Sequence, residues 1–358
     1  MFPIGDIMNA EDCYHVAKLA FVELLKFGST TVMDNWGVMD AVAQAAYDVG
    51  LRAYLTDPIR DADAMRVKDG VYEYHKEIGD KTIRQSVELM EKWHGKDNGR
   101  IQVAMGPHAT DTVSPDLFKE IRRIADQHHL KITTHLAQNQ TEVKQVKERY
   151  GKTTCQYLES VGILGPDFIG GHGIFLTPED ISLLAKSRSS VSHNSVINAK
   201  RGYIAPVADM QKAGVNVGLG TDNMAADIIE VMRVGQMVSR FKTGIPHEPK
   251  PFKMLEMATV NGAKALGVEG QQGSIEAGKL ADLVIVDYRK PHYIPVLKPN
   301  VVANLIHTGL SSDIDTVVVG GKVLVEGGKY IAGNEDEIMD NAQSTAESVW
   351  KRWEESRK

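Results

Sequence analysis

The sequence predicts an α/β fold of the (βα)8 TIM-barrel type with a small β domain after it. Apolar runs of strand length alternate with helical patterns, as parallel βα units require. Seven such runs occur before residue 265, close to the eight strands of a closed barrel. Short β runs with glycine turns follow. We therefore expect a barrel over residues 1–265, a small β domain over 266–335 and a terminal helix over 336–358.

The first predicted helix has sequence signals at both ends, an N-cap residue before it and a glycine after it. The segment "AEDCYHVAKLAFVELLKFG" has a helical apolar period in which Val16, Ala20, Leu24 and Phe27 share a face. Asn9 is the expected N-cap and Gly28 the stop. We expect a strand over 29–34, a helix over 39–50 and a strand over 52–57. A long charged helix then extends to about Trp93.

Five further apolar runs predict the remaining barrel strands. They cover residues 100–108, 131–136, 168–174, 189–194 and 215–223. Two of the intervening helices have clear start signals. Ser114 is an N-cap followed by Pro115, and Thr177 forms a capping arrangement with Asp180.

Composition is ordinary for a globular protein and excludes several function classes. The 358 residues are 42% hydrophobic and 25% charged, and the net charge of -6 with no Lys/Arg run gives no sign of nucleic-acid binding. No apolar run is long enough for a membrane span, and the N-terminus has no signal-peptide pattern. Cys13 and Cys155 lie far apart, so we expect buried, reduced thiols in a cytoplasmic protein.

Four successive predicted strands end in residues that can bind a metal or move a proton. His135, His172, His193 and Asp222 stand at these ends, one on each strand. In a parallel barrel the C-terminal strand ends converge on one mouth, where active sites lie. Imidazole and carboxylate suit a divalent metal such as zinc. A lone histidine of this kind is more often structural, but four such residues in register indicate a functional site.

Longer stretches resemble a known family. They are "HLAQ", "GGHGI", "SHNSVINAKRGYIAPVADMQKAGVNVGLGTDN" and "GSIEAGKLADLVIVD". Together they resemble the amidohydrolase superfamily, in the branch of the S-adenosylhomocysteine/methylthioadenosine deaminases, guanine deaminase and the s-triazine hydrolases (chlorohydrolases). The resemblance covers nearly the whole chain. It implies a TIM barrel with a small β-sandwich, and metal-dependent hydrolysis of C–N, or sometimes C–Cl, bonds of a small heterocyclic substrate.

The resemblance also implies roles for individual residues. His135 and His172 match metal-binding histidines, and Asp222 matches an aspartate that contacts both metal and water. His193 matches a histidine that orients the water or the substrate. His108, in "GPHATDT", matches a residue that often contacts substrate, although a structural hydrogen bond is the alternative. Zinc is the expected metal, with Fe²⁺ or Mn²⁺ as alternatives.

These residue types suit hydrolysis at a ring carbon. A bound metal lowers the pKa of water from ~15.7 toward ~7. Asp222 then takes the proton of the water as general base, and the hydroxide attacks an electron-poor carbon. An amine or a halide leaves.

Two residues depart from the deaminase pattern. Deaminases of this branch have glutamate three residues after the strand-five histidine, and this chain has Gln138. An amide can donate a hydrogen bond but cannot supply a proton, and general acid catalysis is worth ~10²–10⁴-fold. We expect Glu142 to be solvated on the following helix rather than to replace that acid. Asn223, a candidate substrate contact, is closer to the triazine-hydrolase pattern.

The third departure concerns the metal ligands. The first barrel strand of the family carries an H-x-H pair, and the 12 histidines here include no such pair. The resemblance therefore implies a barrel whose first strand is missing. Either the chain is part of a longer protein, or it is a truncated chain with an incomplete site that binds a ligand or partner without catalysis. An unclosed barrel leaves strand edges unpaired, which favours a homo-oligomer.

Overall fold

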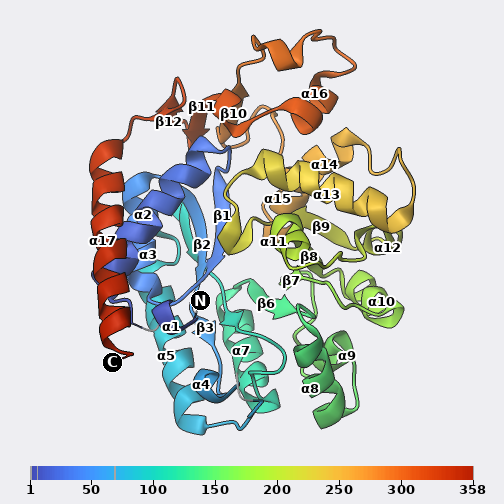
Figure 1. The fold of residues 1–358 in the computed structure, drawn as a ribbon. Coiled ribbons are helices and arrows are strands. Elements are labelled where there is room, and N and C mark those ends of the chain that lie inside the picture. The colour runs from blue at the N-terminus through green and yellow to red at the C-terminus, as the bar shows by residue number, and fades with distance from the viewer. Residues whose placement is uncertain (1, 6, 68–69, 358) are drawn as a thin grey trace.

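The computed structural model describes residues 2–5, 7–67 and 70–357 and shows a curved parallel sheet with helices outside it (Figure 1). The predicted α/β barrel architecture is confirmed. Its strands are β1 (Thr31–Asn35), β2 (Arg52–Thr56), β3 (Pro58–Ile59), β4 (Ile101–Val103), β5 (Gly106–Pro107), β6 (Ile132–Leu136), β7 (Phe168–His172), β8 (Ser190–His193) and β9 (Asn216–Leu219).

The parallel strands follow one another in chain order. β1 pairs with β2 and β2 with β4, β3 pairs with β5, and β6 to β9 form a run of four. Parallel bridges from Met105 to Ile132 and from Ala109 to His135 join the two halves. β1 and β9 stand at the two ends of this series, and no pairing joins them within the described residues. All strand ends that carry candidate site residues therefore point the same way.

Helices connect the strands and cover the outside of the sheet (Figure 1). In the barrel region they are α1 (Phe2–Gly5), α2 (Ala10–Lys26), α3 (Met39–Val49), α4 (Ala64–Val67), α5 (Lys76–Trp93), α6 (Lys96–Gly99), α7 (Pro115–His128), α8 (Gln140–Tyr150), α9 (Thr154–Ser160), α10 (Pro178–Ser187), α11 (Ser195–Lys200), α12 (Val207–Lys212), α13 (Ile228–Thr243), α14 (Pro251–Ala258) and α15 (Val260–Leu266). A short 3-10 helix, η1, spans Asp222–Met224.

The predicted caps are confirmed. The side chains of Asn9, Ser114 and Thr177 each accept a backbone hydrogen bond at the start of α2, α7 and α10. The apolar face assigned to α2 was wrong at Val16 and Ala20, which are exposed, whereas Leu24 and Phe27 are half-buried. The fully buried residues include Phe21 and Leu25. α2 packs between α3 and α17, and these two neighbours decide which of its sides is covered.

The C-terminal part forms a separate antiparallel sheet, as expected for a small β domain. Its strands are β10 (Leu283–Val286), β11 (Ile314–Val319), β12 (Lys322–Glu326) and β13 (Lys329–Tyr330). Between β10 and β11 lie η2 (Pro291–Tyr293), α16 (Val301–Thr308) and η3 (Ser311–Asp313). The terminal helix α17 (Glu335–Glu355) returns to lie along α2 (Figure 1).

A buried ion pair joins the barrel to this small sheet. Arg52 of β2 donates from Nε to Asp282 Oδ2 at 2.8 Å and from Nη2 to Oδ1 at 3.2 Å. Both side chains are at most 7% exposed. Asp282 Oδ1 also accepts the backbone N–H of Gly320 at 2.6 Å, in the turn between β11 and β12. The pair therefore fixes the small sheet against the barrel.

Two other predictions concern single features of the chain. Cys13 and Cys155 are both free and buried, as expected. Within the described residues, no helix combines the length and the apolar character needed to cross a lipid bilayer.

Candidate metal and active site

Three of the predicted strand-end residues lie side by side. The rings of His135 on β6 and His172 at the end of β7 are nearly parallel, with centroids 5.7 Å apart and 20° between the ring planes. Nε2 of His172 lies 3.3 Å from Oδ2 of Asp222, which follows β9. The convergence of strand ends expected for a parallel barrel therefore brings two imidazoles and one carboxylate to one place.

The Nδ1 atom of each of these histidines is held by an oxygen atom. His172 Nδ1 lies 3.0 Å from Oδ1 of Asn198, and His135 Nδ1 lies 2.6 Å from the carbonyl oxygen of His108. Because an oxygen acceptor favours the proton on Nδ1, each Nε2 keeps its lone pair. This is the pattern that orients metal-binding histidines. Asn198, on α11, was missed by sequence reasoning, and nothing in its spacing marks it.

The histidines of the site are held in the neutral form. Burial, together with the neighbouring His135, lowers the pKa of His172 well below its ordinary value. Burial also lowers the pKa of His135, and it lowers the pKa of His193 to about 4. For His108, burial and the nearby His135 lower the pKa to about 3. Neutral imidazole is the form that binds metals and accepts protons.

His193 has the most unusual surroundings. It is 1% exposed, and neither of its ring nitrogens has a hydrogen-bond partner. The side-chain amide nitrogen of Asn198 is also buried without a partner. Buried polar atoms are rarely left without a hydrogen bond, so such groups point to an absent ligand, ion or water.

Several residues at the same strand ends have strained backbone conformations. Ala137, His172 and Asp222 have φ angles of 45°, 73° and 57°, a left-handed conformation that is uncommon for residues other than glycine. Strained residues of this kind cluster at functional sites. Gly220, just before the Asp222 turn, passes so close to Asn194 that an added Cβ would lie 2.3 Å from the Asn194 amide oxygen. A larger residue at this position would require the side chains of Asn194 and Ser192 to shift.

The donor set fits a divalent cation in kind, and part of it is in place. His172 and Asp222 already lie within reach of a common ion, and His135 has an available Nε2. Over residues 2–5, 7–67 and 70–357, however, no three His, Cys, Asp or Glu side chains are grouped closely enough to hold an ion. The three-residue ligand set thus remains a prediction.

The other predicted site residues flank this centre. His108 Nδ1 lies 3.1 Å from Oγ1 of Thr112, and its ring centroid is 5.1 Å from that of His135. Gln138 is partly exposed, three residues after His135. Asn223 is exposed, and its backbone N–H donates to Asp222 Oδ1 at 2.5 Å. Their assigned substrate contacts remain predictions.

The expectation for Glu142 was wrong. Its side chain is fully buried, and its carboxylate accepts hydrogen bonds from backbone and side-chain donors instead of facing solvent. Burial and the neighbouring Asp111 raise the pKa of this carboxyl group. The sequence held one usable signal, because Asn139 followed three residues later by Glu142 is the spacing of a helix capping box.

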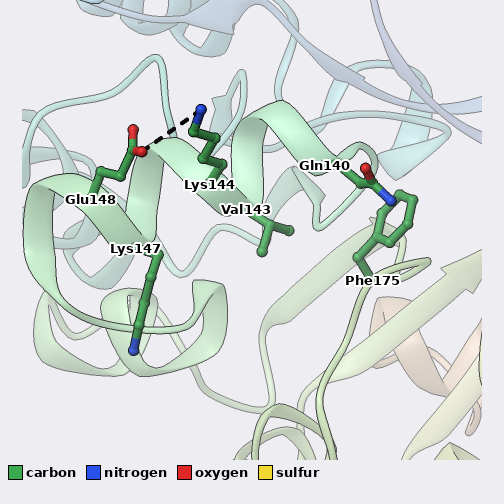
Figure 2. Close-up of a pocket in the computed structure, with 6 residues that line it drawn as sticks. All are labelled: Gln140, Val143, Lys144, Lys147, Glu148 and Phe175. Carbon is green, nitrogen blue, oxygen red and sulfur yellow. Dashed lines mark ion pairs between the residues drawn. The ribbon is translucent and has the colours of Figure 1, made fainter.

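A surface pocket adjoins the strand ends. The backbone N–H of Phe175, after β7, donates to the carbonyl oxygen of Ala137 at 3.0 Å, which places the pocket beside the turn after β6. None of the predicted site residues lines it, and Lys144 pairs with Glu148 at its edge (Figure 2). Its lining residues are Gln140, Val143, Lys144, Lys147, Glu148 and Phe175.

Comparison with known proteins identifies the family. The amidohydrolase family profile matches residues 3–324. The chain belongs to the amidohydrolase family. This amidohydrolase is 35% identical to a 5'-deoxyadenosine deaminase of Methanosarcina barkeri, over 98% of its own length and 78% of that protein. It is also 35% identical to a 5-methylthioadenosine/S-adenosylhomocysteine deaminase of Moorella thermoacetica, over 94% of the chain and 77% of the relative.

Solved structures agree with this assignment. An adenosine deaminase of Xanthomonas campestris with bound zinc superposes with a TM-score of 0.89 at 26% identity, over 98% of this chain and 78% of that one. A zinc-bound atrazine chlorohydrolase of Arthrobacter aurescens superposes with a TM-score of 0.86 at 23% identity, over 94% of this chain and 77% of that one. This similarity shows a shared fold. The predicted family and enzyme class, a hydrolase of C–N bonds other than peptide bonds, are confirmed.

Proposed function

We propose that this amidohydrolase is a metal-dependent deaminase of an adenosine-like heterocycle. The observation that carries the proposal is the grouping of His172 and Asp222 beside His135, with both histidine Nδ1 atoms held by oxygen acceptors. The similarity to deaminases of adenosine derivatives supports the substrate class.

His135, His172 and Asp222 would hold the ion. Zinc is favoured because a similar adenosine deaminase contains it, and the same donor types also admit Fe²⁺ or Mn²⁺. When bound, the ion would supply a Lewis acid that makes water a nucleophile near neutral pH. The residues of the chain do the remaining work.

Asp222 and His193 are suited to different tasks in this reaction. Asp222 Oδ1 accepts the N–H of Asn223, which orients the carboxylate and leaves Oδ2 directed at His172. In that orientation Asp222 can accept the proton of the attacking water. His193 is neutral, and its two unpartnered ring nitrogens provide one donor and one acceptor. We assign it the orientation of the water or of the ring under attack.

Gln138 favours a second candidate reaction. A side-chain amide can donate a hydrogen bond to a ring nitrogen, but it cannot protonate that nitrogen. Displacement of a chloride or alkoxy group requires no proton from this position. A chlorohydrolase-like activity at the same site is therefore the alternative, and the chlorohydrolase fold neighbour is compatible with it.

Metal analysis combined with an ammonia-release assay tests the main proposal. The purified protein is assayed before and after chelation, with 5'-deoxyadenosine, methylthioadenosine, S-adenosylhomocysteine and guanine as substrates, and chloride release from a chlorotriazine is followed in parallel. Ammonia release that chelation abolishes and zinc restores supports deamination. Chloride release alone supports the second candidate. Absence of turnover on every ring, with metal bound, contradicts both.

We further propose a cytoplasmic homo-oligomer. The two free, buried cysteines are typical of a reducing compartment. The strands β1 and β9 at the ends of the sheet series are edges that a second subunit can cover. Light scattering of the purified protein tests the oligomeric state.

A further inference from the structure

The turn after β6 is an irregular piece of backbone that carries Gln138 at the edge of the site. Ala137 is completely buried and adopts a left-handed φ of 45°, so the chain leaves the strand direction directly after Leu136. The backbone N–H groups of Ala137 and Gln138 consequently turn away from the sheet ladder. A buried N–H group without a partner is destabilising, so such a turn requires an acceptor.

Glu142 is that acceptor. Its Oε1 accepts the N–H of Ala137 at 3.0 Å, and its Oε2 accepts the N–H of Gln138 at 2.8 Å. Oε1 also accepts the hydroxyl of Thr110 at 2.6 Å, which ties the turn to the segment after His108. The carboxylate thus joins helix α8, the turn after β6 and the neighbouring His108 segment in one place.

The two faces of α8 differ sharply in chemistry. Its outer face presents Val143, Lys144 and Lys147 to the surface pocket (Figure 2). Glu142, in the first turn, is 0% exposed, and its backbone N–H donates to the N-cap side chain of Asn139 at 2.8 Å. A carboxylate is placed in the interior only where it satisfies donors that no apolar side chain can satisfy.

We infer that Glu142 is a positioning residue for Gln138. Its buried carboxylate holds the turn that sets where the Gln138 side chain stands relative to the strand-end histidines. The side-chain hydrogen bonds of Glu142 in the described part of the chain run to Thr110, Ala137 and Gln138, so its effect on catalysis passes through the turn that carries Gln138. The effect of Glu142 on catalysis rests on the proposed function. Its effect on the turn after β6 rests only on the hydrogen bonds.

Hydrogen exchange tests the structural part without any assay of activity. Glu142→Gln keeps the size of the side chain but turns one oxygen acceptor into a donor. The amides of Ala137 and Gln138 should then exchange at least about 10-fold faster, as expected for the loss of a buried hydrogen-bond acceptor. Glu148→Gln, the same change at an exposed position of α8, is the matched control and should leave their exchange unchanged. Unchanged exchange in Glu142→Gln overturns the inference.

A double-mutant cycle tests the catalytic part. Glu142→Gln should lower kcat about 10- to 100-fold in the wild-type background, as small displacements of site groups do. In a Gln138→Ala background the same change should lower kcat by less than about 3-fold, because the positioned side chain is already gone. Equal losses in both backgrounds would show a general structural role and overturn the inference. If Glu142→Gln does not fold, Glu142→Asp, whose shorter side chain retracts the carboxylate, replaces it in both tests.

The two hypotheses fail in different ways. Absence of wild-type turnover counts against the proposed function, and the exchange experiment then decides the role of Glu142. Wild-type turnover with an undiminished kcat in Glu142→Gln contradicts only the positioning role.

Discussion

Nε2 of His172 lies 3.3 Å from Oδ2 of Asp222, although 49 residues of intervening sequence separate the end of β7 from the turn after β9. Because neither residue is near the other in the chain, only the parallel order of β7, β8 and β9 brings them together. We propose two tasks for this carboxylate, metal binding and proton acceptance.

Replacement of Asp222 by asparagine should therefore remove activity while keeping the shape of the side chain. An amide cannot take a proton from water, so we expect kcat to fall by about 10²–10⁴-fold. Steady-state ammonia release measures this loss. Asp209→Asn, at an exposed position of α12, is the control and should retain full activity. An Asp222→Asn enzyme with nearly normal kcat would exclude the general-base assignment.

Asn198 should control metal affinity without contacting the metal. Its Oδ1 holds His172 Nδ1 at 3.0 Å and so fixes the ring. Loss of such a partner typically weakens metal binding about 10- to 100-fold. We expect Asn198→Ala to show that loss in a zinc titration against a competing chelator. Asn198→Asp keeps an oxygen acceptor and should stay within a few-fold of wild type. Equal affinity in all three proteins would contradict this role.

Gln138→Glu distinguishes the two candidate reactions. If Gln138 occupies the position of the missing acid, glutamate restores a proton donor and should raise deamination by about 10²-fold or more. The rate of ammonia release from an adenosine derivative measures the gain. Displacement of chloride from a triazine needs no such proton and should gain much less. No increase in deamination would show that residue 138 does not stand beside the ring.

The pH dependence of stability should report on His193. Burial lowers the pKa of this histidine to about 4, against an ordinary value near 6.5 in the unfolded chain. Between these values the folded state binds fewer protons than the unfolded chain. The contribution of His193 to the free energy of unfolding is therefore fully present above pH 6.5 and is lost as pH falls through 4. The loss is at most about 3 kcal/mol.

Urea denaturation of chelated protein from pH 7 to pH 4 measures this contribution. His193→Asn should show a shallower fall in the free energy of unfolding than wild type. His247→Asn, at an exposed site, is the control and should follow the wild-type curve. If the free energy of unfolding falls equally with pH in His193→Asn and wild type, the pKa of His193 is not lowered in the folded protein.

The joint between barrel and small sheet depends on Asp282. This carboxylate binds both Arg52 and the backbone of Gly320 while almost fully buried. Asp282→Ala leaves the guanidinium buried without a partner, which should cost about 3–5 kcal/mol. Chemical denaturation measures the change. Asp315→Ala, on the same small sheet but exposed, should cost far less. Similar losses in the two variants would contradict a stabilising joint.

The sequence predicted the elements whose signals are local. Strand-length apolar runs and the caps at Asn9, Ser114 and Thr177 depend on neighbouring residues, and all three caps are present. The placement of His172 and Asp222 followed from a single topological rule, that parallel strands end at one mouth. That rule requires no knowledge of side-chain packing.

Features that depend on tertiary contacts could not be predicted in the same way. Glu142 was expected in solvent because a polar residue on a surface helix usually is, and the left-handed turn at Ala137 that demands a buried acceptor leaves no mark in the sequence. Asn198 reaches His172 from a different βα unit. The apolar face of α2 was misassigned in part because its packing depends on α17, which lies more than 300 residues later in the chain.

The proposed metal site is tested by an anomalous-scattering map of crystals grown with zinc and measured at the zinc absorption edge. We expect a peak about 2.0–2.2 Å from Nε2 of His135, Nε2 of His172 and a carboxylate oxygen of Asp222. A peak elsewhere, or no peak at these three residues in crystals soaked with excess zinc, would contradict the proposed metal site.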